Sequence, residues 1–172
     1  IQTDIYYLSI PYGARFPEKV LKERRAKGQI STYYTCCTEQ FPGTFSFSNP
    51  ADATWIGIHA VAGDYDGYLR WAVNSWTRDP LRDSRFRTWA AGDTYSIYPG
   101  PRSSIRFERL VEGLQDAEKI WQLRNQYKKT GDTRRLARLN KKLAEFTPAN
   151  ITAEQERNAG RMVRETERVL ND

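Results

Sequence analysis

With 172 residues and 39% hydrophobic content, the chain is long enough to bury one substantial core and too short for two full-sized domains. The net charge of +6 comes from 27 basic and 21 acidic residues mixed along the chain, with no nucleic-acid-binding motif, so we expect no nucleic-acid partner. No run of about 18 apolar residues is present, and we expect no membrane-spanning helix. The first residue, Ile1, indicates a processed or excised chain and leaves export undecided.

Strand-like and helix-like segments alternate over the first part of the chain. Four runs rich in β-branched and aromatic residues end in turn residues, which predicts strands over residues 4–10, 30–37, 68–76 and 93–98. Helix formers follow each run, which predicts helices over residues 18–27, 51–62 and 84–90, and from Ser104 onward. Strands joined through helices form parallel sheets with right-handed crossovers, and four such units make half of an eight-stranded barrel. The predicted fold class is therefore α/β, as half of a (β/α)8 barrel.

Beyond Gly131 the composition changes to that of a helical hairpin. Apolar residues recur at helical spacing on two segments, and Thr152 with Gln155 matches a capping box at the start of the second. The predicted organisation is a half-barrel over residues 1–130 and a C-terminal helical hairpin over residues 131–172. Basic residues between the apolar positions of the first hairpin helix indicate a solvated helix face more than a phosphate-binding patch; they are Arg134, Arg135, Arg138, Lys141 and Lys142.

Active sites of parallel barrels lie at the carboxyl ends of the strands, so the side chains found there are the candidates for binding. The four expected strand ends carry aromatic residues and one amide, namely Tyr12, Tyr34, Asn74, Trp76 and Tyr98. Aromatic rings stack on the C–H faces of sugars, while an amide and phenol hydroxyls hydrogen-bond to ring substituents. This combination suits a neutral sugar, and the alternative that these aromatic residues cap a core stays open.

Other reactive residues are sparse. Cys36 and Cys37 are adjacent, which excludes a disulfide framework, and the single histidine, His59, lies in a helical segment with apolar neighbours. We therefore expect neither a metal site nor Cys–His catalysis, and no cofactor. Glu39 and Asp79 follow strand ends and are the best local candidates for an acid or a base, with a solvated loop position as the alternative.

Several motifs resemble one known family in order and spacing. They are residues 33–37 (YYTCC), 67–76 (GYLRWAVNSW), 92–100 (GDTYSIYPG), 104–110 (SIRFERL) and 112–116 (EGLQD). Together they resemble the C-terminal region of the catalytic domain of glycoside hydrolase family 123. The resemblance covers residues 4–123 and leaves the hairpin outside it.

The resemblance implies a (β/α)8-barrel β-N-acetylgalactosaminidase of the retaining, substrate-assisted kind, in which the 2-acetamido oxygen of the sugar attacks the anomeric carbon. The family places an adjacent Asp-Glu pair at the end of strand four, where the Asp orients the acetamido group and the Glu serves as general acid and base. This chain contains no adjacent Asp-Glu pair. The resemblance thus implies that its strands are strands five to eight, and that the pair lies upstream of Ile1.

By the same resemblance, Tyr34, Asn74, Trp76 and Tyr98 line the sugar pocket, and no catalytic residue lies in this chain. The implied partners are an N-acetylhexosamine-containing glycan and either the upstream half of the barrel or a second copy of the chain. A periplasmic or extracellular location is suggested by the resemblance alone. The alternative function is a non-catalytic carbohydrate-binding or assembly module, in which the half-barrel associates to cover its open sheet edges.

Overall fold

The computed structural model describes residues 3–85, 88–100, 102–147 and 153–172. The strands are β1 (Tyr7–Pro11), β2 (Ile30–Thr35) and β3 (Gly67–Arg70). The α-helices are α1 (Glu18–Ala26), α2 (Pro50–Ala62), α3 (Ile105–Thr130), α4 (Thr133–Leu143), α5 (Ala153–Arg157) and α6 (Ala159–Asn171). One 3-10 turn, η1 (Ala144–Phe146), follows α4.

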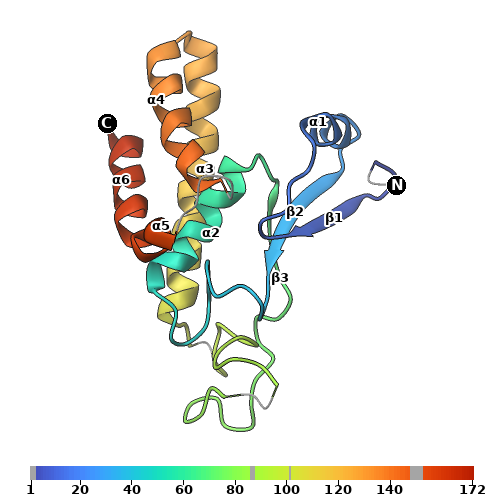
Figure 1. Cartoon of the computed structure of the whole chain (residues 1–172), viewed down its shortest axis with the longest axis vertical. Coiled ribbons are helices and arrows are strands. Elements are labelled where there is room, and N and C mark those ends of the chain that lie inside the picture. Colours follow the sequence, from blue (N-terminus) through green and yellow to red (C-terminus); the bar gives the residue numbers. More distant parts are fainter. Residues whose placement is uncertain (1–2, 86–87, 101, 148–152) are drawn as a thin grey trace.

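The strands form one parallel sheet in the order β1-β2-β3, with the long helices α2 and α3 to one side of it (Figure 1). Tyr33 of β2 pairs with Tyr68 of β3, so both side chains share one face. Tyr33 is 1% exposed, and its hydroxyl donates a 2.7 Å hydrogen bond to the Ile56 carbonyl of α2. The next pair, Tyr34 and Leu69, lies on the opposite face. Leu69 is 39% exposed, which shows that this second face is open.

A buried arginine ties α1 to the sheet. Arg24 of α1 is fully buried, and its Nε donates a 2.7 Å bond to the Ser31 hydroxyl. Its Nη2 and Nη1 donate to the carbonyl oxygens of Ile30 at 2.6 Å and Ile5 at 2.8 Å. Because a buried guanidinium is tolerated only when its donors are satisfied, these bonds explain how the helix turns a charged side chain inward.

Two glycines let α2 and α3 approach to backbone contact. A Cβ added at Gly57 would lie 2.1 Å from the carbonyl oxygen of Gly113, and one added at Gly113 would lie 2.4 Å from that of Thr54. The Thr54 hydroxyl donates a 3.1 Å bond to the Arg109 carbonyl across the same contact. The helix pair therefore depends on the absence of side chains at its crossing.

The main hydrophobic core lies between α2, α3 and the C-terminal helices. It joins Trp55 of α2 and Ile120 of α3 to Leu139 of α4, Phe146 of η1 and Met162 of α6, all buried. The Trp55 ring lies 4.3 Å from the Phe146 ring, measured between centroids. The hairpin thus packs on α2 and α3 rather than around a core of its own, and the division between residues 130 and 131 stays a prediction.

The expected fourth strand is wrong, and the third is shorter than expected. Strand β3 ends at Arg70, and residues 93–98 form turns whose contact with the chain after β3 is an antiparallel bridge between Asn74 and Tyr95. The backbone of this segment bonds to the chain after β3, since the Ser96 amide donates to the Val73 carbonyl at 2.9 Å. A buried ion pair, with Arg70 Nη2 2.5 Å from Asp93 Oδ1, holds the start of the segment at the end of β3. Over the described residues, the α/β class is confirmed with a three-stranded parallel sheet in place of the four expected strands, and the half-barrel stays a prediction.

Two local predictions meet gaps in the description. The helix expected over residues 84–90 is not formed at 84–85 or 88–90, and residues 86–87 lie outside the described part. The capping box falls on Thr152, which also lies outside it, and α5 begins at Ala153.

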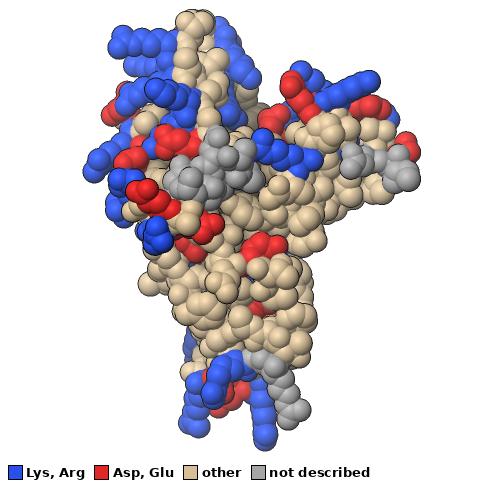
Figure 2. All heavy atoms as spheres, viewed as in Figure 1, with Lys and Arg blue, Asp and Glu red and all other residues tan. Residues whose placement is uncertain are grey.

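Basic side chains gather over the free end of the α3–α4 pair, along the edge of the helical side and at the loop tip below, while the centre of this face is largely uncharged (Figure 2). The basic residues of α4 are mostly exposed, as a solvated helix face requires. Lys142 differs, because its Nζ lies 2.9 Å from Glu145 and 2.7 Å from Glu165, and its side chain is only 12% exposed.

Candidate functional site

The carboxyl end of β3 is organised by the Arg70–Asp93 ion pair. The Asp93 side chain is fully buried and that of Arg70 is 9% exposed. Arg70 also donates to the Thr35 carbonyl at the end of β2, at 3.1 Å, and to the Asp93 carbonyl at 2.6 Å. One guanidinium therefore joins the ends of two strands to the 93–98 segment. The choice of candidate residues from the expected strand ends missed this ion pair. Arg70, an arginine inside a strand motif, was the signal that could have found it.

A second arginine holds the same region against α3. Arg106 is 7% exposed, and its Nη1 donates to the carbonyl oxygens of Thr44 at 2.6 Å and Gly92 at 2.7 Å. Gly92 has a φ of +80°, and a Cβ there would meet Arg106 Nη1 at 2.5 Å, so a glycine is required beside this guanidinium. The loop before α2, the 93–98 segment and the start of α3 are thus fixed together.

Three of the sequence-predicted residues are brought together on this frame. Asn74 forms the antiparallel bridge with Tyr95, and the Tyr98 ring packs against the Tyr95 ring at 5.2 Å between centroids. The Trp76 indole donates a 2.8 Å bond to the Ile97 carbonyl. Trp76 is 43% exposed, so a ring face remains free while its N–H is engaged. Asn74, Trp76 and Tyr98 therefore form one aromatic and amide surface beyond the end of β3.

Tyr34 and Tyr12 lie on different faces of the sheet. Tyr34 lies on the open face, because the neighbouring Tyr33 faces the helices. The Tyr12 ring lies 5.1 Å from the His59 ring on the helix-covered face. Its pKa is raised, chiefly by burial and then by the charges of Glu156 and Asp52. The structure therefore does not bring the Tyr12 ring together with Tyr34 or with the surface beyond β3.

The local acid candidates are not poised for proton transfer. Glu39 Oε2 accepts a 2.7 Å bond from the Cys36 amide, and Oε1 accepts a 2.8 Å bond from the Thr38 hydroxyl. Burial acts to raise the pKa of Glu39, but these hydrogen bonds outweigh it and the pKa is lowered. Glu39 is thus an ionised anchor for the chain after β2. Asp79 lies on an exposed turn, 3.8 Å from Arg82.

The cysteine pair and the histidine have structural surroundings. Cys36 and Cys37 are both free thiols. The pKa of Cys37 is raised, chiefly by burial and secondly by the neighbouring Cys36 thiol, and this disfavours a thiolate. His59 is 1% exposed, and its Nδ1 lies 2.6 Å from the Phe146 carbonyl oxygen. Across the described ranges, no three His, Cys, Asp or Glu side chains are grouped so that they could hold a metal ion.

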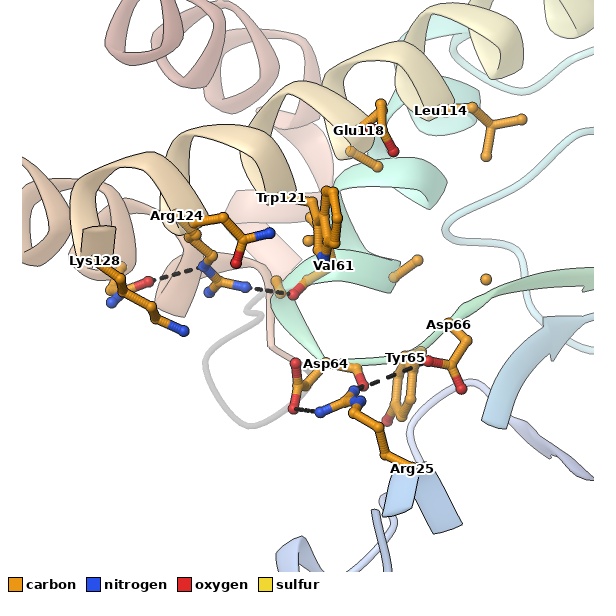
Figure 3. A pocket seen from close by; sticks show the side chains of 16 residues that line it. Arg25, Val61, Asp64, Tyr65, Asp66, Leu114, Glu118, Trp121, Arg124 and Lys128 are labelled. Carbon is orange, nitrogen blue, oxygen red and sulfur yellow. Dashed lines mark hydrogen bonds and ion pairs between the residues drawn. The ribbon is translucent and has the colours of Figure 1, made fainter. Parts of the chain in front are cut away.

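A cavity of about 810 Å³ is lined by other residues than the aromatic and amide surface, and Figure 3 shows it from close by. One wall is α3, with Trp121 58% exposed and Leu114 47% exposed. The other is the turn before β3, where Arg25 Nη1 donates a 3.0 Å bond to Asp64 Oδ2. The cavity therefore adjoins the amino end of β3. Because parallel α/β sites form at the carboxyl ends of strands, its volume alone does not mark the active site.

No helix within the described residues is long and apolar enough to cross a membrane.

Comparison with known proteins places this chain. No curated protein matches it. A solved structure, described as a family 123 glycoside hydrolase from Clostridium perfringens in a study of glycolipid glycan hydrolysis, superposes with a TM-score of 0.81 at 19% sequence identity. The superposition covers 98% of this chain and 32% of that chain, so this chain spans about a third of its structural neighbour. The model of the glycoside hydrolase 123 catalytic domain matches residues 1–123. The chain therefore belongs to glycoside hydrolase family 123.

Proposed function

We propose that this chain supplies sugar-binding residues to a glycoside hydrolase that removes terminal N-acetylhexosamine, as a β-N-acetylgalactosaminidase does, and that an Asp-Glu catalytic pair lies on a segment upstream of Ile1. The observation that carries the proposal is the clustering of Asn74, Trp76 and Tyr98 beyond the carboxyl end of β3, in a chain of family 123. In this proposal the chain corresponds to the C-terminal part of a (β/α)8 barrel, and no catalytic residue lies within it.

The proposed reaction is retaining and substrate-assisted. The 2-acetamido oxygen of the bound sugar attacks the anomeric carbon, and the aglycone oxygen leaves with a proton from the upstream Glu. Water then attacks the anomeric carbon, the bond from that carbon to the acetamido oxygen breaks and restores the acetamido group, and the proton of the water passes to the same carboxylate. The role of this chain is to hold the sugar in position, with the free face of the Trp76 ring for stacking and the Asn74 amide for hydrogen bonding.

Two features support placing the proton transfer outside this chain. The sequence contains no adjacent Asp-Glu pair. Glu39, the acid candidate that follows β2, has a lowered pKa because its hydrogen bonds to Cys36 and Thr38 outweigh burial. A general acid working near neutral pH needs a raised pKa instead.

The test begins by sequencing the gene upstream of Ile1 and by measuring the intact mass of the protein that the natural gene encodes. The full product is then assayed on a chromogenic β-N-acetylgalactosaminide. We expect turnover that is abolished by replacing an upstream Asp-Glu pair. A natural frame that begins near Ile1, together with no turnover, would rule out the enzyme proposal.

The sugar-binding role is tested by Trp76→Ala, with Trp121→Ala as the matched control. Both indoles are about half exposed, but Trp121 lies in the cavity wall on α3. We expect Trp76→Ala to weaken binding of N-acetylgalactosamine, followed by NMR titration, with little change in melting temperature. The control variant leaves sugar affinity unchanged. A large drop in melting temperature at unchanged affinity for Trp76→Ala would place this residue in the fold instead.

A second candidate function is a non-catalytic carbohydrate-binding or assembly module. The observation that favours it is apolar surface exposed at two places. Leu69 is exposed on the open face of the sheet, and Leu114 and Trp121 are exposed on α3. Such surface requires cover, either from an upstream half of the barrel or from a second copy. Sedimentation of the 172-residue chain at micromolar concentration tests the second copy, and a well-behaved monomer contradicts it.

A further inference from the structure

A second cavity, of about 390 Å³, lies where the start of α2 meets α5, α6 and α3. Four arginines from three helices line it: Arg109 of α3, Arg157 of α5, and Arg161 and Arg164 of α6. The other described lining residues are uncharged, so the described part of the wall carries four positive charges and no carboxylate. We propose that this arginine cavity binds a tetrahedral oxyanion, a sulfate or phosphate group, at a site separate from the sugar-binding surface.

The charges in the arginine cavity are only partly neutralised by their neighbours. Arg109 forms an ion pair with Glu112, and Arg161 Nε lies 3.8 Å from Glu165. Arg157 and Arg164 have no carboxylate within 4 Å among the described residues. Arg157, Arg161 and Arg164 are exposed and Arg109 is partly buried. Like charges along one cavity wall disfavour each other, and a bound anion offsets that repulsion. Planar guanidinium groups also match two oxygens of a sulfate or phosphate at once.

The backbone brings Arg164 close to the wall of this cavity. Gly160 lies one turn before it on α6, and a Cβ there would lie 3.3 Å from Arg164 Nη1 and 3.6 Å from the Ala51 Cβ of α2. The absence of a side chain at Gly160 therefore lets the guanidinium lie along α6 beside the start of α2. Within the described part of the chain, Arg164 has this packing contact and no ion pair.

The amides at the start of α2 are not the basis of the proposal. Asn49 Oδ1 accepts a 3.0 Å bond from the Ala51 amide, and Pro50 has no amide hydrogen to offer. The guanidinium groups are left as the donors that an anion meets. The positive end of the thirteen-residue α2 adds to the same potential without contributing specificity.

The ligand has two sources with the same chemistry: free inorganic sulfate or phosphate, and an ester carried on a sugar. We would titrate the 172-residue chain with sodium sulfate, galactose 6-sulfate and unmodified galactose, holding ionic strength constant with sodium chloride. The readout is the NMR shift of the Gly160 amide and of the arginine Nε–H groups. We expect both sulfates to shift these signals and galactose to leave them unchanged.

Charge-removing variants make the test specific. Arg157→Gln and Arg164→Gln are each expected to weaken sulfate affinity about tenfold, because each removes a charge-assisted donor pair. Arg134→Gln is the matched control, since it removes an exposed arginine of α4 outside the cavity and is expected to change the affinity less than about twofold.

Tighter binding of the sugar ester than of sulfate would support the proposal and assign the site to an anionic glycan. Equal binding of both would also support it and assign the site to the oxyanion alone. Absence of binding by either sulfate would overturn the proposal, as would equal weakening by Arg134→Gln and the two cavity variants. Because neither readout involves glycoside hydrolysis, failure here leaves the proposed function untouched.

Discussion

Acidification is expected to destabilise the protein through His59. The imidazole is 1% exposed and its Nδ1 lies 2.6 Å from the Phe146 carbonyl oxygen, so the neutral ring donates this bond. Burial lowers the pKa of His59 from 6.5 to about 4, and the hydrogen bond to Phe146 only partly opposes this. The unfolded chain therefore binds a proton at this histidine between about pH 6.5 and pH 4, while the folded chain does not.

The sign and size follow from this difference in proton binding. The contribution of His59 is present above pH 6.5 and is lost as the pH falls toward 4. A separation of roughly 2.5 pH units between the two pKa values corresponds to about 3 kcal/mol. Asp52 acts in the opposite sense, because burial raises its pKa from 3.8 to about 6, so the folded state takes up a proton first. The histidine must therefore be isolated by comparison with a variant.

The assay is urea unfolding followed by tryptophan fluorescence at pH 7, 6, 5 and 4, for the natural chain and for His59→Gln. The glutamine is uncharged at every pH, and its amide can donate to the Phe146 carbonyl. From pH 7 to pH 4, we expect the unfolding free energy of the natural chain to fall by about 3 kcal/mol relative to that of His59→Gln. A difference that stays constant with pH would refute the reasoning, because it would mean that His59 titrates alike in both states.

Two further substitutions probe the packing. Gly57→Ala is expected to lower the unfolding free energy in urea by about 2 kcal/mol, because its Cβ would lie 2.1 Å from the Gly113 carbonyl oxygen. The control is Gly67→Ala, whose Cβ would have its nearest atom 3.8 Å away and which is expected to change stability by less than about 0.5 kcal/mol. Equal effects would show that the helices separate freely. Asp93→Asn is expected to cost about 3 kcal/mol by leaving the 9%-exposed Arg70 without its carboxylate, and an unchanged melting temperature would show that the ion pair contributes little.

Most of the strands and helices were predictable from the chain itself. Side-chain periodicity and turn residues predicted β1, β2, α1, α2 and α3 at nearly their observed positions. These signals are local, because they arise from the conformational preferences and one-sided burial of consecutive residues. The family resemblance was confirmed for the same reason: its motifs are runs of the sequence, and the family model matches residues 1–123.

The arrangement of the candidate site was decided by tertiary contacts. Tyr12 follows β1 and Tyr34 lies near the end of the neighbouring strand β2, yet their rings lie on opposite faces of the sheet. The run over residues 93–98 has strand-like composition, but it forms turns, bends and isolated bridges, and the buried pairing of Asp93 with Arg70 ties its start to β3.

The sequence by itself therefore determined most of the elements, although not the loss of the fourth strand, and the family to which the chain belongs. Only the tertiary structure decided which strand-end side chains meet, because a buried ion pair between residues 23 positions apart has no local pattern. The same holds for the arginine cavity, whose four charges come from three helices and are brought together by the packing of α6 on α2.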